Sequence, residues 1–251
     1  MKAMVLAAGL GTRLRPLTNE RPKALVEING RTLLEITLTR LQSFGVDEAI
    51  VNVHHFADMI LDYLVAKQNF GMRIEISRED ELLDTGGGLK KAGWFFLEDC
   101  RDEPFLLHNV DVLSDIDLAQ MMQFHNERCA LATLAVQERQ SSRHLLFDQQ
   151  GQLCGRRFER EQRTELARPV EPLEAFAFCG IHAISPRLLG MMTETGTFSI
   201  IETYLHLASR DEKIMALRAD ESYWRDLGTV ESLIEAQADF QRSVLPSLGS
   251  S

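Results

Sequence analysis

Cysteine is scarce in this chain, and no two cysteines have the spacing of a metal or redox motif. The four are Cys100, Cys129, Cys154 and Cys179, with no C-x-x-C pair among them. A zinc site is therefore disfavoured, and a reduced cytoplasmic setting is expected. No stretch reaches the ~18 consecutive apolar residues that a membrane-spanning helix needs. Because the first apolar run stops at a glycine after a few residues, we expect no signal peptide.

Positive charge is also in short supply. Lys and Arg total 27 against 37 Asp and Glu, which gives a formal net charge of −10. Nucleic acid and anionic membranes both require a basic surface, so neither is expected as a partner. A local basic pocket for a small anion is still possible. A chain of 251 residues is long enough for one large α/β domain or two small ones.

The first half of the chain alternates between strand and helix patterns. Short apolar or alternating runs predict strands, and runs with a 3.6-residue apolar period predict helices. The expected strands cover residues 2–8, 48–54, 73–77, 104–111 and 130–136, and the expected helices 32–45, 57–68, 87–96 and 118–127. This alternation is typical of a Rossmann-like, doubly wound α/β fold with a mostly parallel sheet.

The second half shows a different pattern. A hairpin with a Gln-Gly turn is expected over 144–158, a strand over 175–185, and a helix around Leu205 and Leu207. These elements predict a small antiparallel elaboration of a mixed sheet. Because no linker or repeat interrupts the chain, one domain is expected over 1–240, with a nucleotide-binding part to about 136 and a sugar-binding part over 137–240. The tail, 241–251, is expected to be disordered.

The loop after the first strand contains two glycines and two cations. Its sequence lacks the Gly-Lys-Ser/Thr of a Walker A loop, and Leu14 stands where a Rossmann fingerprint needs a third small residue. Gly9 and Gly11 allow the backbone to approach a ligand and expose its N–H groups. Arg13 offers a planar fork for phosphate oxygens, and Lys23 adds a mobile point charge. The loop is therefore suited to a triphosphate.

Five segments of the chain resemble the signature of the sugar-1-phosphate nucleotidyltransferases. They are LAAGLGTRLRPLT with RPKAL (6–25), LLDTGGGLKKA (82–92), LLHNVDVLSDIDL (106–118), FAFCGIHAISPRLL (176–189) and YWRDLGTVESLIEA (223–236). They follow the family's order and cover nearly the whole chain. The pattern is most similar to the short bacterial branch with N-acetylmuramate-1-phosphate uridylyltransferases and mannose- or heptose-1-phosphate guanylyltransferases.

The resemblance implies a reaction in which an NTP and a sugar-1-phosphate give an NDP-sugar and pyrophosphate, for envelope or polysaccharide precursors. It assigns nucleotide binding to Ala7, Ala8, Gly9, Gly11, Thr12, Arg13, Lys23, Thr85, Gly86, Gly87 and Asn109. The backbone N–H groups of Thr85, Gly86 and Gly87 are expected to act as donors at a helix start. Val110 stands where the family usually has Gly or Ala, and its side chain should point away from the face that Asn109 and Asp111 share.

Catalysis is expected to depend on Arg13, Lys23 and Asp111. The resemblance makes Asp111 and Asp226 ligands of a catalytic Mg²⁺, and two carboxylates with triphosphate oxygens form the hard oxygen site that this ion prefers. Asp115 and Asp117 lie close by in sequence, but both are expected to cap the helix that begins near Leu118.

Contacts to the sugar are harder to locate. Candidates are Arg143, His144, Glu171 and Gly180. Arg143 and His144 lie where the muramate enzymes have an acidic contact, which argues against N-acetylmuramate. The motifs select neither the nucleobase (UTP, GTP, CTP or dTTP), the sugar nor an oligomeric state. Transfer to another phosphate such as phosphocholine, or a catalytically silent nucleotide-sensing subunit, are the alternatives.

Overall fold

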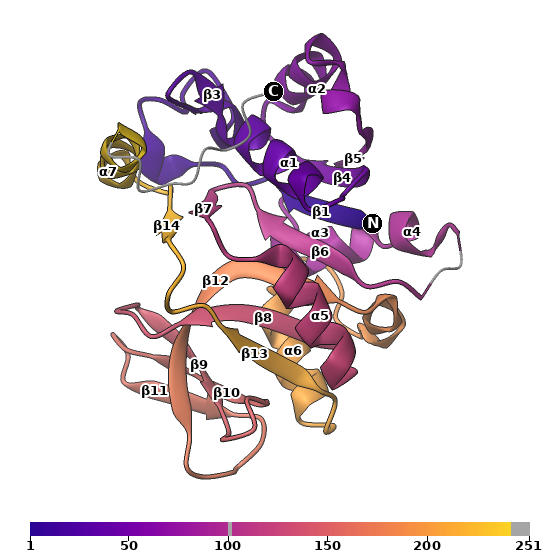
Figure 1. The fold of residues 1–251 in the computed structure, drawn as a ribbon, viewed down its shortest axis with the longest axis vertical. Helices are drawn as coiled ribbons and strands as arrows, with labels where there is room; N and C mark the ends of the chain where they lie inside the picture. The colour runs from indigo at the N-terminus through magenta and orange to yellow at the C-terminus, as the bar shows by residue number, and fades with distance from the viewer. Residues whose placement is uncertain (100–101, 242–251) are drawn as a thin grey trace. The chain divides into compact units, whose positions relative to one another are not determined.

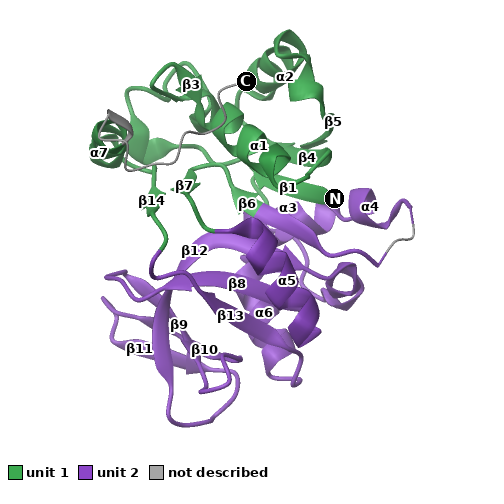
Figure 2. Cartoon of the chain, in the orientation of Figure 1, with its two compact units in different colours: residues 1–83, 108–116, 222–251 green, residues 84–107, 117–221 purple. Residues whose placement is uncertain are grey.

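A computed structural model describes residues 1–99 and 102–241 of the chain. Contacts divide it into two compact units that are interleaved in sequence (Figure 2). The first unit contains Met1–Leu83, His108–Ile116 and Ser222–Ser251, and the second contains Asp84–Leu107 and Asp117–Glu221. The functional boundary predicted near residue 136 remains a prediction. Residues 242–251 of the tail predicted to be disordered lie outside the described residues.

Parallel strands and helices form the centre of the first unit (Figure 1). Strands β1 (Lys2–Leu6), β4 (Glu48–Val53) and β5 (Arg73–Arg78) pair in parallel, and α1 (Leu33–Ser43) and α2 (Ala57–Ala66) alternate with them. The cap of α1 is Thr32, whose hydroxyl accepts the N–H of Glu35 at 3.0 Å. The predicted order of strands and helices over residues 2–78 is therefore confirmed.

Short elements complete the first unit. They are the 3₁₀ turns η1 (Thr12–Leu14), η2 (Lys23–Leu25) and η3 (Gln68–Gly71), the pair β2 (Glu27–Ile28) and β3 (Arg31–Thr32), the pair β7 (Val112–Ser114) and β14 (Trp224–Asp226), and α7 (Val230–Gln241). Strands β7 and β14 are antiparallel, with Asp226 opposite Val112. This pairing brings residues 224–226 beside the segment that follows Asp111.

The second unit contains the antiparallel elaboration. Its elements are α3 (Asp84–Ala92), α4 (Trp94–Leu97), α5 (Leu118–Arg128), β8 (Ala132–Gln137), β9 (Arg143–Phe147), β10 (Leu153–Phe158), β11 (Arg163–Leu166), β12 (Glu174–Ile184), η4 (Pro186–Met191), α6 (Ile200–Ala208) and β13 (Ile214–Arg218). Strands β9, β10, β11 and β12 pair antiparallel, β8 pairs antiparallel with β12, and β13 runs parallel to β8. The predicted hairpin is confirmed, and Gly151 in its turn has φ +77°. Strand β6 (Phe105–Asn109) begins in the second unit and ends in the first.

The α/β fold with a mixed sheet and an antiparallel elaboration is thus confirmed. One boundary differs clearly from the prediction, because α3 starts at Asp84 rather than near Gly87. No helix in residues 1–99 or 102–241 has both the length and the apolar character that a membrane span requires.

His125 in α5 gives the second unit a pH-dependent stability. Burial lowers the pKa of this histidine from 6.5 to about 4, and its Nδ1 lies 3.0 Å from the hydroxyl of Thr133. The unfolded chain binds a proton below about pH 6.5 and the folded chain only below about pH 4. Stability is therefore lost as the pH falls through this window, by about 2–3 kcal/mol.

We expect the wild type and His125→Asn to converge in unfolding free energy between pH 7 and pH 4. Asparagine cannot take up a proton. The difference in unfolding free energy between the two proteins therefore reports on His125 alone, because the carboxylates titrate in both. Urea titrations at four or five pH values measure it. Parallel pH profiles for the two proteins would contradict the assignment.

Candidate active site

A glycine-containing loop follows β1 and forms one wall of the site. Gly11 has φ +61°, a left-handed conformation that disfavours other residues. A Cβ at Gly11 would lie 3.0 Å from the Thr18 methyl and 3.1 Å from the Lys23 Cβ. The hydroxyl of Thr18 donates to the Gly11 carbonyl at 2.8 Å and fixes this turn. The space where Gly9 would carry a Cβ is open, with no described protein atom within 4 Å.

The predicted site residues of the loop and of the segment after it differ in their exposure to solvent. Ala7 and Ala8 are buried at its base, whereas Gly9, Thr12 and Arg13 are exposed. Lys23 is buried in η2, after Pro22. Its ammonium group donates a hydrogen bond to Asp111 Oδ2, and the two side chains are 9% and 20% exposed. The most enclosed cation of this segment thus already faces the first of the predicted metal ligands.

Asp226 and Arg13 form a second charged pair in the same unit. Arg13 Nη2 lies 3.9 Å from Asp226 Oδ1, which also accepts the N–H of Gly228 at 2.8 Å. A Cβ at Gly228 would stand 2.5 Å from Arg13 Nη2 and from Asp226 Oδ1, so a side chain there would displace both groups from their present positions. Strand β14 pairs with β7, and the N–H of Leu227 donates to the carbonyl of Asp111 at 2.8 Å. The two acids therefore lie on hydrogen-bonded neighbouring segments.

The donor set fits a metal that takes most of its ligands from a substrate. In the part of the chain that the structure describes, no three His, Cys, Asp or Glu residues form a metal-binding group. Asp111 and Asp226 supply two hard carboxylates, and a Mg²⁺ ion commonly binds one or two carboxylates plus phosphate oxygens and water. A site with few protein ligands next to a phosphate-binding loop is consistent with that chemistry.

The two neighbouring acids have different structural roles. Asp117 caps α5 by accepting the N–H groups of Ala119 and Gln120 at 2.9 Å each, so its predicted capping role is confirmed. The same prediction is wrong for Asp115, whose carboxylate accepts the N–H of Tyr223 at 2.7 Å. Asp115 instead fastens the segment that leads into β14.

The end of β6 carries two polar groups that are buried without a partner among the described residues. They are the side-chain oxygen of Asn109 and Nε2 of His108. Burial beside Arg40 lowers the pKa of His108 to about 4, so the ring is neutral near pH 7. Val110 is buried, but it lies with Asp111 in the turn after β6, so the strand alternation that predicted a shared face for Asn109 and Asp111 does not extend to them. The role of Asn109 in nucleotide contact remains a prediction, and its buried oxygen is an acceptor that a ligand donor could satisfy.

The glycine turn at the start of α3 is used within the second unit. The N–H groups of Gly86 and Gly87 donate to the carbonyl of Phe198 at 2.9 and 3.3 Å, and the Thr85 hydroxyl accepts the N–H of Ile200 at 3.0 Å. A Cβ at Gly86 would lie 2.4 Å from the Phe198 ring. The Gly86 and Gly87 amides thus act as donors at the start of α3, and in this structure their acceptor is the Phe198 carbonyl. A nucleotide role for these three residues remains a prediction.

The predicted sugar contacts also lie in the second unit, and two have structural partners there. His144 uses both ring nitrogens, toward Glu159 Oε1 at 2.8 Å and the Arg139 carbonyl at 3.1 Å. The exposed Arg143 stacks with its guanidinium 5.7 Å from the centre of the Phe158 ring.

Gly180 and Glu171 have no contact that identifies a ligand site. Gly180 has φ +74° where the pairing of β12 with β8 shifts register, which explains a glycine there. Glu171 is exposed and precedes a cis proline. The substrate roles of all four residues, Arg143 and His144 included, remain predictions.

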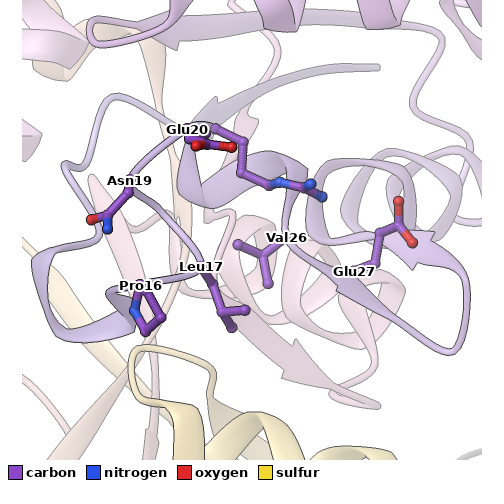
Figure 3. Close-up of a pocket in the computed structure, with 7 residues that line it drawn as sticks. Pro16, Leu17, Asn19, Glu20, Val26 and Glu27 are labelled. Carbon is purple, nitrogen blue, oxygen red and sulfur yellow. The ribbon is translucent and has the colours of Figure 1, made fainter.

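Two hollows open along the segment that joins Arg13 to Lys23. The larger, about 490 Å³, is lined by Pro16, Leu17, Asn19, Glu20, Arg21, Val26 and Glu27 (Figure 3). The other is lined by Leu10, Arg15, Thr18, Asn19 and His55. Because two carboxylates line the larger hollow, it is a poor site for a triphosphate. The glycine loop and its cations fit that ligand better.

Several residues that shape the site were missed by sequence reasoning. Gly228 and Thr18 stand inside two of the segments that resemble the family signature, and nothing else in the sequence marks them. Asn52 and Glu79, which form buried hydrogen bonds below the loop, were not noticed. A polar residue inside the apolar run AIVNV was the available signal for Asn52.

Comparisons with known proteins identify the family of the chain. The family profile described as nucleotidyl transferase matches residues 2–147. N-acetylmuramate alpha-1-phosphate uridylyltransferase of Caulobacter vibrioides is 34% identical over 245 residues, covering 94% of this chain and 95% of that protein. Mannose-1-phosphate guanyltransferase of Yarrowia lipolytica is 31% identical over 231 residues, covering 91% of this chain and 61% of that longer protein.

Solved structures show the same fold. The structure of a UDP-glucose pyrophosphorylase complexed with UDP-glucose has a TM-score of 0.76 and 19% sequence identity to this chain. The superposition covers 96% of this chain and 98% of the pyrophosphorylase chain. At that identity, the likeness is evidence for the fold and not for a substrate.

Proposed function

This chain belongs to the nucleotidyl transferase family, and on that premise we propose that it joins a nucleoside triphosphate to a sugar-1-phosphate. The products are an NDP-sugar and pyrophosphate. The observation that carries the proposal is the meeting of Lys23 with Asp111, and of Arg13 with Asp226, on hydrogen-bonded segments of the first unit. Two cations and two carboxylates beside a glycine loop match the needs of a reaction between two phosphates.

The reaction needs no nucleophile from the protein. An oxygen of the sugar phosphate forms a bond to the α-phosphorus, and the bond from that phosphorus to the bridging oxygen breaks. Pyrophosphate leaves with the electron pair. A phosphate monoester has a second pKa of about 6, so the attacking group is already largely dianionic at pH 7. The protein has to bring two anions together and stabilise the developing charge.

Each charged side chain has a place in this scheme. The backbone around Gly9 and Gly11, with Arg13, holds the triphosphate. We assign Lys23 to the point where the attacking phosphate meets the α-phosphate, and its hydrogen bond to the anionic Asp111 supports this role. Asp111 and Asp226 would hold Mg²⁺. When bound, the ion supplies positive charge to the triphosphate and fixes its orientation.

The identity of the substrates is the finer part of the proposal. The two relatives described above are a uridylyltransferase and a guanyltransferase by name. We therefore expect UTP or GTP as the nucleotide, with an N-acetylmuramate, mannose or heptose phosphate. We place the reaction in the cytoplasm, as a supplier of precursors for envelope or surface polysaccharides.

A pyrophosphate-release assay tests the function directly. We would combine UTP, GTP, CTP and dTTP with N-acetylmuramate-1-phosphate, mannose-1-phosphate, heptose-1-phosphate, glucose-1-phosphate and phosphocholine, each with Mg²⁺. One sugar phosphate should react at least tenfold faster than phosphocholine. If the protein binds a nucleotide but none of the pairs reacts, the proposal is contradicted and a sensing role is favoured.

A further inference from the structure

A buried polar network lies below the glycine loop in the first unit. The N–H of Ala7 donates to Asn52 Oδ1 at 2.7 Å, and Asn52 Nδ2 donates to Glu79 Oε1 at 2.7 Å. The N–H of Leu83 donates to the other oxygen, Glu79 Oε2, at 3.0 Å. Asn52 and Glu79 are each only 2% exposed. Burying such groups is costly unless each is hydrogen-bonded, so the network is either fully formed or destabilising.

The strands place these two side chains next to each other. Asn52 lies in β4 between the buried Val51 and Val53, directly opposite Leu6 in the pairing with β1. Glu79 follows β5, and its own N–H donates to the carbonyl of Val53 at 2.8 Å. A polar pair has therefore been built into an otherwise apolar stretch of the parallel sheet.

The direction of the hydrogen bonds requires a carboxylate at position 79. Because Ala7 donates to Asn52 Oδ1, the amide must present its Nδ2 donor to Glu79. The backbone of Leu83 presents a second donor to the same side chain. Only a carboxylate offers two acceptors and no donor, whereas a glutamine would turn its NH₂ group toward one of the two donors.

We propose that Asn52 and Glu79 are positioning residues for nucleotide binding, because one buried carboxylate fixes, through Asn52, the backbone of Ala7 at the start of the glycine loop. The same carboxylate holds the N–H of Leu83, where the first stretch of the first unit ends. The network sets the backbone of both segments before a ligand arrives, which lowers the ordering cost of binding. This inference rests on the proposed function, since it concerns the same nucleotide.

Two variants change the hydrogen bonding of the network while keeping the volume of each side chain nearly the same. Glu79→Gln leaves one of the two donors facing an NH₂ group. Asn52→Asp still accepts from Ala7 but sets a carboxylate against Glu79. We expect each to weaken binding of UTP or GTP, whichever the wild type binds, about ten- to thirtyfold. The catalytic rate at saturating NTP, and the KM for the sugar phosphate, should stay within about twofold.

The pH dependence separates positioning from a general loss of stability. In Asn52→Asp, two adjacent carboxyl groups can share one proton at low pH, which restores a donor between them. Nucleotide affinity of Asn52→Asp should therefore recover toward the wild-type value between pH 8 and pH 5.5. The affinity of Glu79→Gln, measured beside it by equilibrium titration, should show no such recovery relative to the wild type.

Gln137→Glu is the matched control. It makes an amide-to-acid change at another buried side chain, whose Nε2 donates to the Ala219 carbonyl at 2.7 Å in the second unit. It should lower stability toward urea as the two variants do, yet keep wild-type nucleotide affinity. Should Asn52→Asp not fold, Glu79→Gln alone carries the comparison.

The outcomes distinguish this inference from the function that it rests on. If the wild type binds nucleotide and both variants bind it within twofold, Asn52 and Glu79 are structural only and the inference is overturned. If the wild type itself binds neither UTP nor GTP, the proposed function and the inference both fail. Reduced affinity in the variants but not in Gln137→Glu supports the positioning role.

Discussion

Replacing Lys23 with methionine is expected to lower the maximal rate of pyrophosphate release about 10²–10³-fold, the usual effect of removing one preorganised charge-stabilising group. Methionine fills a similar volume, so the buried segment around η2 should keep its packing. What is lost is the ammonium group that now faces Asp111 Oδ2. The affinity for NTP should change much less than the rate, because the charge matters most when the two phosphates meet.

A steady-state assay with saturating NTP and sugar phosphate measures this effect. Lys91→Met, an exposed lysine of α3 in the second unit, is the control for the loss of one positive charge. It should keep nearly the full rate. Near-normal turnover in Lys23→Met would remove Lys23 from the mechanism, and an equal loss in both variants would point to net charge rather than position.

The convergence of the charged residues could be predicted from sequence only in part. The glycine loop with Arg13 and Lys23 follows from the chemistry of phosphate binding. Asp111 was predicted to end a strand, where α/β folds place their ligands, and the structure places it in the turn directly after β6. Asp226 had no such signal of its own, because an acid before a Gly-Thr turn is common, and only the resemblance to a family connected it with Asp111. The structure supplies the physical link through the pairing of β7 with β14.

Other features depend on contacts that spacing does not reveal. The three consecutive glycines predict a helix boundary, yet α3 includes all of them, and the Phe198 carbonyl accepts hydrogen bonds from the Gly86 and Gly87 amides. Packing on the Phe198 ring explains why Gly86 carries no side chain. The sequence therefore marks this glycine segment, but the hydrogen bonds that its amides form in the fold could not be predicted from it.

The pair Asn52 and Glu79 is a second case in which a contact could not be predicted from the sequence. A polar residue in a buried strand can be noticed in a sequence, but its partner lies on another strand. Parallel pairing of β4 with β5 decides that partner, and the register sets Asn52 opposite Ser77, two residues before Glu79. The succession of strands and helices along the chain was predictable from the alternating pattern, whereas the individual cross-strand contact was not.

Asp226→Asn should raise the Mg²⁺ concentration needed for half-maximal activity about tenfold or more, and lower the rate at 1–2 mM Mg²⁺ about 10²-fold, in line with the usual cost of weakening a metal site. Asparagine keeps the oxygen that accepts the Gly228 N–H at 2.8 Å, so the turn should persist. It removes the charge that attracts both Arg13 and a divalent cation. Since the side chain is 44% exposed, the fold should tolerate the change.

A metal titration of pyrophosphate release separates this role from a structural one. If Asp226 binds the ion, high Mg²⁺ should restore part of the lost rate, and EDTA should abolish activity in both the variant and the wild type. Asp115→Asn is the matched control, because that acid belongs to the same unit but fastens the Tyr223 amide instead. Its Mg²⁺ dependence should equal that of the wild type. An unchanged Mg²⁺ requirement in Asp226→Asn would show that the carboxylate serves Arg13 and the turn rather than the metal.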